Sequence, residues 1–130
     1  MIEKKRIKDG QRHQKGAVQK GKLGEKIAQD YLKNSGVKII CVNYHSRYGE
    51  VDIIGLDGDS LVFYEVKAYL RQSVNPSEFI TLKKIGNIKK TVLIFLNKFE
   101  NGKFLDTMCR IDLICIRNFE HVFDHIKNIA

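Results

Sequence analysis

The sequence predicts an α/β fold: a helix, a three-strand meander, a second helix and returning strands, which together form a mixed central sheet flanked by helices. Three observations support this prediction. Apolar residues recur at helical spacing in residues 19–34 and again in residues 85–99. Between these segments, two short apolar runs flank a tight turn of the kind that joins antiparallel strands. A chain of 130 residues is long enough to form one domain with its own hydrophobic core.

The first predicted helix spans residues 19–34 and is followed by Gly36, a residue typical of helix C-caps. Glu25 lies at the edge of the apolar stripe of this helix, so its carboxylate either leans toward the sheet or belongs to the ordinary polar surface. Residues 37–43 are then predicted to form the first strand. The apolar stripe consists of Leu23, Ile27, Ala28, Tyr31 and Leu32.

The segment between the predicted helices contains a β-hairpin whose strands carry acids. Its turn, at residues 57–60, combines Asp-Gly and Gly-Asp, which are strong hairpin signals. If the loop is Gly58-Asp59, or all four turn residues, Asp52 faces Glu65 and Glu50 faces Lys67. If the loop is the first two turn residues, Glu50 faces Glu65 instead. In either register two carboxylates oppose each other, and their repulsion is costly unless a cation lies between them.

These acids and a neighbouring lysine match the requirements of metal-assisted phosphodiester hydrolysis. Glu65 and Lys67 are two residues apart on a strand, so both side chains project from the same face. Carboxylate oxygens suit Mg²⁺, which polarises a phosphate and acidifies a bound water. A lysine beside the ion can orient that water or offset charge in the transition state. The alternative is that these residues belong to a solvated sheet face, since Glu-x-Lys is a common tripeptide.

The same motif carries a resemblance to known proteins. Gly-Glu-Val-Asp, a hairpin and then Glu-Val-Lys resemble the metal-binding core of the PD-(D/E)xK, restriction-endonuclease-like superfamily. Within it the chain resembles the YraN family of small bacterial proteins, and its motif is similar to that of archaeal Holliday-junction resolvases. The similarity covers about residues 20–126. One position departs from the family pattern, because Tyr69 stands where a basic residue is usual. The matching positions include Gly21, Gly24, Glu25, Gly36, Asn43, Arg47, Pro76, Ile80, Lys83, Arg110 and Asp112.

This resemblance implies a restriction-endonuclease-like fold and a site for Mg²⁺ or Mn²⁺. Asp52 and Glu65 would be metal ligands and Lys67 the catalytic lysine. Glu25 would supply a further acid and metal ligand from the first helix, with Glu50 as an accessory acid. The function implied is a metal-dependent nuclease that hydrolyses the phosphodiester bonds of DNA, including structured or branched DNA. The alternative is a non-catalytic nucleic-acid-binding or protein-interaction module that retains the fold.

The second predicted helix begins at Asn75 as N-cap, with Pro76 at its first position and Glu78 at its third. Its apolar positions recur until Phe99, and the helix ends before Asn101. It is predicted to cross over to a strand that lies parallel to the second strand of the hairpin. Further strand segments are predicted at residues 104–105, 110–116 and 122–126.

The distribution of charge suits a nucleic-acid partner, which the resemblance implies to be DNA. The formal net charge is +8, and residues 1–22 carry eight basic and two acidic residues. We expect residues 1–18 to form a mobile basic arm that attracts phosphates, and residues 19–130 to form the nuclease-like domain. A solubilising tail and a solvated lysine face are the alternatives. The candidate nucleic-acid contacts are Lys4, Lys5, Arg6, Lys22, Arg47, Lys83 and Lys84.

The remaining composition predicts a cytoplasmic protein without a membrane partner. No apolar run approaches the roughly 20 residues that span a bilayer, and the basic N-terminus has no apolar leader segment. The three cysteines, Cys41, Cys109 and Cys115, lie among apolar residues and are predicted to be reduced core residues of strands. A homodimer is a further expectation for the assembly.

Overall fold

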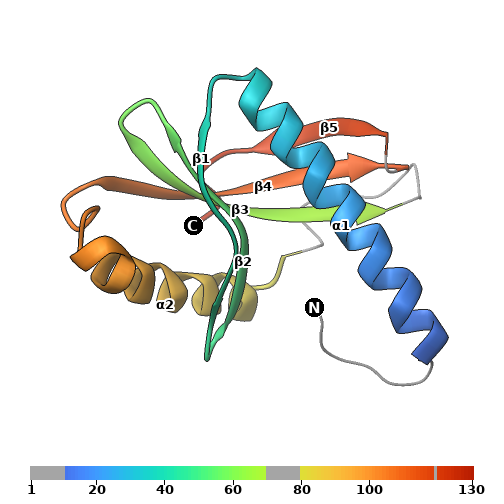
Figure 1. The fold of residues 1–130 in the computed structure, drawn as a ribbon, viewed down its shortest axis with the longest axis horizontal. Helices are drawn as coiled ribbons and strands as arrows, with labels where there is room; N and C mark the ends of the chain where they lie inside the picture. Colours follow the sequence, from blue (N-terminus) through green and yellow to red (C-terminus); the bar gives the residue numbers. More distant parts are fainter. Residues whose placement is uncertain (1–10, 70–79, 119) are drawn as a thin grey trace.

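A five-stranded sheet lies between two helices in the computed structural model, which describes residues 11–69, 80–118 and 120–130 (Figure 1). The predicted order of helix, three-strand meander, helix and strands is confirmed. The elements are α1 Gln11–Asn34, β1 Lys38–Ser46, β2 Gly49–Asp57, β3 Ser60–Tyr69, α2 Leu82–Lys98, the short 3-10 turn η2 Phe99–Asn101, β4 Met108–Arg117 and β5 His121–Ile126.

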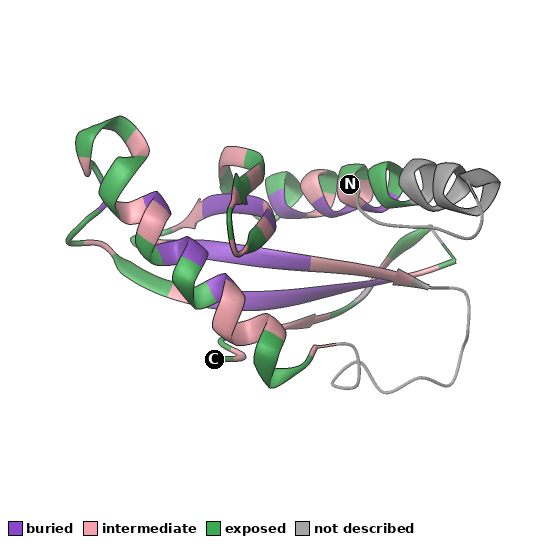
Figure 2. Cartoon of the chain, turned by 90° about the horizontal axis from the view of Figure 1, so that it is seen from below, coloured by how far each residue is buried: buried purple, intermediate pink, exposed green. Residues whose placement is uncertain are grey.

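The sheet is mixed, as predicted, with the strand order β1-β2-β3-β4-β5. β1, β2 and β3 form an antiparallel meander, and β5 pairs antiparallel with β4. β4 pairs with β3 in parallel, because α2 carries the chain back to the start of β3 before β4 begins. The two helices cover opposite faces of the sheet (Figure 2).

Each helix buries an apolar stripe against its own face of the sheet, so the domain has two core clusters. On the α2 side, the ring of Phe95 packs edge-on against Phe63 at a centroid distance of 5.7 Å. On the α1 side, Ala28 and Leu32 are fully buried with Tyr64 of β3. Alternate residues of β3 therefore serve different clusters, as expected for a strand that is covered on both faces.

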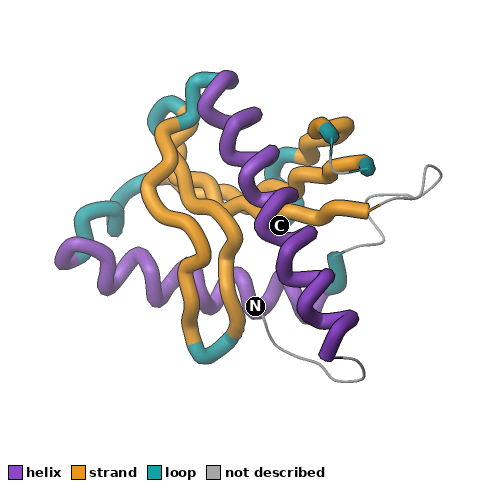
Figure 3. The backbone as a smooth tube through the Cα atoms, turned by 45° about the vertical axis from the view of Figure 1, so that its right-hand side comes forward, coloured by secondary structure: helices purple, strands orange, loops and turns teal. Residues whose placement is uncertain are grey.

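The strands β2 and β3 separate partway along their length, and this separation positions the candidate site. They pair from Asp57 opposite Ser60 only as far as Ile53 opposite Tyr64. Beyond that point β3 continues beside β4, whereas β2 stays paired with β1 as far as Gly49. The β1–β2 hairpin consequently bends away from the rest of the sheet (Figure 3). This divergence of β2 from β3, starting at Asp52 and Glu65, is called the fork below.

The helix boundaries differ from the predicted ones at their N-terminal ends. α1 begins at Gln11 instead of residue 19, because its first turns lack the apolar stripe from which a helix could be predicted. α2 begins at Leu82, and the Thr81 side chain accepts a hydrogen bond from the backbone N–H of Lys84 at 3.1 Å. Thr81 therefore acts as the N-cap, and the predicted cap at Asn75 with Pro76 and Glu78 lies outside the described residues. Among the described residues, no helix is both long and apolar enough to cross a membrane.

Two predictions about the region around β4 are wrong. Residues 104–105 form part of a turn, not a strand, although Phe104 is still buried because its ring stacks near those of Phe95 and Phe99. Cys109 is exposed, because it lies at the start of β4 ahead of the buried positions that begin at Ile111. All three cysteines are free, and Cys115 is the one that is buried.

Candidate functional site

Asp52 and Glu65 lie at the fork, one position beyond the last β2–β3 pair, Ile53 with Tyr64. This is the predicted register in which Asp52, and not Glu50, is the acid opposite Glu65. At the point where the strands separate, Asp52 Oδ2 accepts a hydrogen bond from the backbone N–H of Val66 at 2.8 Å. The Asp52 carboxylate thus replaces the lost strand partner of this N–H group, which fixes its orientation.

The surroundings of Asp52 oppose its ionisation. Burial is the main cause that raises the pKa of Asp52, and the charge of Glu65 raises it further. The hydrogen bond from Val66 acts in the opposite direction, but the charges of Glu25 and Glu50 add to the rise, and the pKa stands well above its ordinary value. A cation at the fork would favour the ionised form of Asp52.

Glu65 is almost fully buried, with 4% of its side chain exposed, and its two oxygens have different surroundings. Glu65 Oε2 lies 3.5 Å from Nζ of Lys67 and 3.6 Å from Nζ of Lys84. Glu65 Oε1 is buried and has no hydrogen-bond partner among the described residues. A buried carboxylate oxygen without a partner is costly, so Oε1 is the atom of this site that most needs a ligand.

The helix α1 brings a third acid, Glu25, to the fork, which is one of the two positions that the sequence leaves open for it. Burial raises the pKa of Glu25, a side-chain hydrogen bond with Asn43 lowers it, and the charges of Glu50 and Glu65 raise it again. Asn43 has a positive φ of 52°, a backbone conformation that Asn tolerates better than most residues. The sequence alone does not indicate that Asn43 is a partner of Glu25, because their contact joins two different elements.

Glu50 has another strand partner than the predicted one. It pairs with His45 of β1, and Glu50 Oε1 lies 3.5 Å from His45 Nδ1. The pairing of Glu50 with Lys67 does not form, because β2 has already left β3 at this point. The charge of Glu50 still acts on Asp52 and on Glu25, so it belongs to the same electrostatic cluster.

The acids of the fork fit a hard divalent cation by their chemistry. As the side chains stand, no three His, Cys, Asp or Glu of the described residues are grouped closely enough to hold a metal ion. Three other observations still match such an ion. The donors are all oxygens, Glu65 Oε1 has no partner in the part of the chain that the structure describes, and burial and the neighbouring acids oppose the ionisation of Asp52. The ammonium groups of Lys67 and Lys84, which lie near Glu65 Oε2, place positive charge beside these acids.

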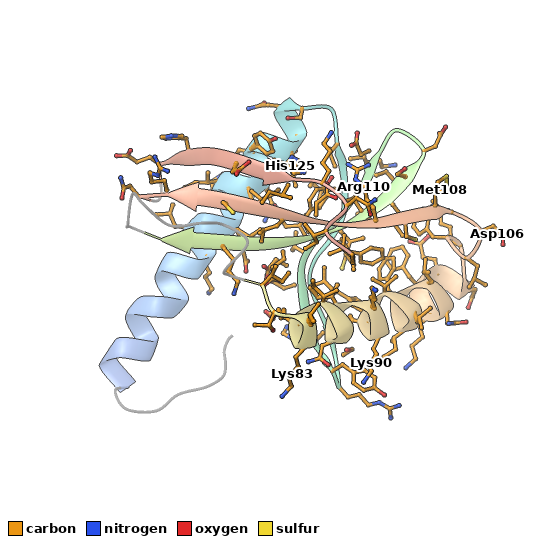
Figure 4. The ribbon with its side chains drawn as sticks, turned by 180° about the vertical axis from the view of Figure 1, so that it is seen from behind. Lys83, Lys90, Asp106, Met108, Arg110 and His125 are labelled. Carbon is orange, nitrogen blue, oxygen red and sulfur yellow. The ribbon has the colours of Figure 1, made fainter. Side chains whose placement is uncertain are left out.

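The predicted basic residues occupy different places. Lys84 lies at the fork, whereas Lys83 is exposed on the outer surface of α2 (Figure 4). Arg47 is exposed at the tip of the β1–β2 hairpin, and Lys22 is exposed on α1. The three basic residues at positions 4–6 lie outside the described residues.

A buried network around Asp112 was missed by the sequence analysis. Asp112 is fully buried and accepts hydrogen bonds from Arg110 Nε at 3.0 Å, His125 Nε2 at 2.8 Å and the backbone N–H of Asn128 at 3.0 Å. Nδ1 of His125 lies 2.8 Å from the Tyr31 hydroxyl, so the network joins α1, β4 and β5. An Arg and an Asp two residues apart on a buried strand were the signal, since both side chains share one face.

Comparison with known proteins identifies relatives over most of the chain. A protein-family model described as "Uncharacterised protein family UPF0102" matches residues 24–116, which include the four acids of the fork and Lys67. A UPF0102 protein of Persephonella marina is 41% identical over 111 residues, which are 84% of this chain and 90% of the relative. One from Acinetobacter baumannii is 39% identical over 115 residues, 88% of this chain and 80% of the relative. One from Syntrophomonas wolfei is 43% identical over 79 residues, 58% of this chain and 67% of the relative.

Proposed function

Since the chain belongs to UPF0102, the YraN-like family that its sequence resembles and whose description names no activity, we propose a function from its own side chains. The protein is a metal-dependent nuclease that hydrolyses phosphodiester bonds of DNA. The observation that carries this proposal is the arrangement at Glu65. One of its oxygens is buried and has no partner among the described residues, and the other lies near two lysines. Asp52 lies on β2, one position beyond the last residue that pairs with β3.

The four acids of the fork would have different roles. Asp52 and Glu65 would hold Mg²⁺ or Mn²⁺, with Glu25 as a further ligand and Glu50 as an accessory acid. When bound, such an ion polarises a phosphate and acidifies a water molecule. Asp52 is already oriented by the hydrogen bond that its Oδ2 accepts from Val66, so it need not be ordered again when the ion binds.

Lys67 acts on the attacking water. Its ammonium group lies 3.5 Å from Glu65 Oε2, and 37% of its side chain is exposed, so it meets both the acid cluster and the solvent. From this position it orients the water, and its charge offsets the negative charge that develops on the phosphate. Lys84 reaches the same carboxylate oxygen from α2 and would contact a phosphate from the other side.

Cleavage of labelled DNA tests this proposal. Single-stranded, duplex and four-way-junction DNA are incubated with wild type, Asp52→Asn and Lys67→Met, in Mg²⁺, in Mn²⁺ and in EDTA. The proposal predicts metal-dependent cleavage by the wild type, and a rate about 10²–10⁴-fold lower in both variants. Asp59→Asn is the matched control, because it removes the same charge at the exposed turn of the same hairpin. Equal cleavage by wild type and both variants would refute the assignment.

A non-catalytic nucleic-acid-binding module is the alternative. The departure at Tyr69, where the resembled family usually has a basic residue, favours it. Under this alternative the wild type binds DNA in the same experiment but leaves every substrate intact in both metals.

A further inference from the structure

We propose that the strand bound at the fork is unpaired, and that the β1–β2 tip and α2 together recognise it. This inference rests on the proposed nuclease function and names its substrate class. The recognition site is a small pocket between the tip of the hairpin and the first half of α2. It is lined by Tyr48, Gly49, Glu50, Lys84, Asn87, Ile88 and Thr91.

The ring of Tyr48, which lies close to two cations, forms one wall of this site. Cζ of Arg47 lies 5.1 Å from the centroid of the Tyr48 ring, and Nζ of Lys90 lies 4.9 Å from it. Arg47 and Tyr48 come from the hairpin tip, whereas Lys90 comes from α2, where it lies on the outer surface of the helix (Figure 4). Basic groups interleaved with an aromatic ring are typical of surfaces that bind single-stranded nucleic acid.

Hydrogen bonds hold this wall in place. The backbone N–H of Tyr48 donates to the Ser46 hydroxyl at 3.1 Å, and the Ser46 hydroxyl lies 2.7 Å from that of Thr91. Thr91 is buried in α2 and donates to the backbone carbonyl of Asn87 at 3.0 Å. The hairpin tip is therefore attached to α2, and Tyr48 does not depend on a ligand for its position.

The pocket is continuous with the acids of the fork through two shared residues. Lys84 lines the pocket and lies 3.6 Å from Glu65 Oε2. Glu50 also lines it and stands two residues before Asp52 on β2, so both side chains project from the same face of the strand. A strand that lies along the pocket would thus bring a neighbouring phosphate to the proposed metal site. The repulsion between Glu50 and a phosphate is offset by Lys84 in the same lining.

The dimensions of the site favour an unpaired strand over a duplex. The pocket volume is about 40 Å³, which admits phosphate oxygens or water but no base. A base must therefore stack outside the pocket, and the exposed guanidinium group of Arg47, whose Cζ lies 5.1 Å from the centroid of the Tyr48 ring, is available for such stacking. Bases in a duplex are already stacked on each other, so a duplex can use only its phosphates here.

Fluorescence anisotropy in EDTA tests the inference without requiring cleavage. A labelled single strand and a blunt duplex of matched sequence are titrated with wild type, Tyr48→Ala, Tyr48→Phe and Lys90→Gln. We expect the wild type to prefer the single strand, and Tyr48→Ala to bind it about tenfold more weakly while duplex binding is unchanged. Tyr48→Phe keeps the ring and should bind as the wild type does. Lys103→Gln is the matched control for Lys90→Gln, since Lys103 lies over the Phe104 ring at 5.5 Å in the segment after α2.

Two results would overturn the inference. If the wild type binds the single strand and the duplex with equal affinity, the site does not prefer an unpaired strand. If Tyr48→Ala binds the single strand with wild-type affinity and has an unchanged melting temperature, the Tyr48 ring does not take part in recognition of the strand. Either result leaves the nuclease proposal intact, because metal-dependent cleavage is measured separately. Conversely, loss of cleavage alone leaves the binding preference standing.

Discussion

At the scale of single residues, the Asp52 carboxylate has two opposing effects on the stability of the domain. Its carboxylate satisfies the backbone N–H of Val66, yet burial and the charge of Glu65 raise its pKa. A group whose folded-state pKa is raised contributes stability below its unfolded pKa, and this contribution is lost as pH rises through the folded value. Without a metal, the burial of Asp52 beside Glu65 therefore lowers the stability of the domain as the pH rises.

Asp52→Asn is predicted to raise the melting temperature in EDTA at about pH 7. The amide oxygen can still accept from Val66, while the charge repulsion with Glu65 disappears. We expect a gain of about 1 kcal/mol, or about 4 °C for a domain of this size. Thermal unfolding followed by circular dichroism measures it, with Asp59→Asn as control. A melting temperature below that of the control would show that the charge of Asp52 does not destabilise the domain.

The sequence indicated the acids of the site but not all their contacts. The alternation of a strand and the signals of the turn placed Asp52 opposite Glu65 and set Glu65 and Lys67 on one face. The approach of Lys84 to Glu65 depends on how α2 packs on the sheet, which no local pattern contains. The role of Val66 depends on where the β2–β3 pairing stops, and the sequence leaves that point open.

At the scale of elements, Asp112 joins α1, β2, β4 and β5. It bonds to Arg110 and His125, and Nη2 of Arg110 lies 2.7 Å from Oδ2 of Asp57 at the end of β2. Burial would raise the pKa of Asp112, but hydrogen bonds from His125, from Arg110 and from the backbone of Asn128 hold it below its ordinary value. The stability that Asp112 supplies is present above its unfolded pKa and is lost as pH falls through the folded value.

Asp112→Ala is predicted to destabilise the domain by about 3–5 kcal/mol near neutral pH, because it removes a fully buried carboxylate that accepts hydrogen bonds from Arg110, His125 and the backbone of Asn128. The difference from wild type should shrink as the pH falls below about 4, where the aspartate of the unfolded chain is protonated. Urea unfolding across this pH range measures both effects. Asp124→Ala, at an exposed position of β5, serves as control and should change little. A difference that stays constant with pH would contradict the account.

The close pairing of β1 and β2 leaves no room for a side chain at Gly55. A Cβ there would lie 2.7 Å from Cγ1 of Val37 and 3.1 Å from the carbonyl oxygen of Lys38. Gly55→Ala is predicted to cost about 1–3 kcal/mol of unfolding free energy. Gly86→Ala in α2, where a Cβ meets nothing within 4 Å, should instead add about 0.5–1 kcal/mol. Chemical denaturation of both variants checks the pair, and a stable Gly55→Ala would contradict the packing described.

The type and order of the elements could be predicted, whereas several of their ends could not. Helical stripes and hairpin signals are local, and they identified both helices and the meander. Asn75-Pro76 and Thr81 both offer cap chemistry. Thr81 is the N-cap of α2, whereas Asn75 lies outside the described residues. The first turns of α1 carry no apolar stripe, so the sequence gives no sign of them.

At the scale of the whole molecule, the fork follows from pairing between distant segments. β3 can leave β2 because β4 pairs with it in parallel along its full length, from Ser60 with Met108 to Tyr69 with Arg117. The helices α1 and α2 lie on opposite faces, and each directs one charged side chain, Glu25 or Lys84, to the same point. Long-range pairing of this kind is not contained in any local sequence pattern. The hairpin pattern therefore predicted the facing acids and Lys67, and the resemblance to a known family implied Glu25 as a further acid.

Calorimetric titration of Mn²⁺ tests most directly whether the acids that meet at the fork form a metal site. Wild type, Asp52→Asn and the control Asp59→Asn are titrated under the same conditions. The account predicts that the wild type and Asp59→Asn bind the ion equally, and that Asp52→Asn binds it at least about tenfold more weakly. Absence of binding to the wild type, or equal binding to Asp52→Asn, would contradict the central claim that the acids of the fork hold a metal.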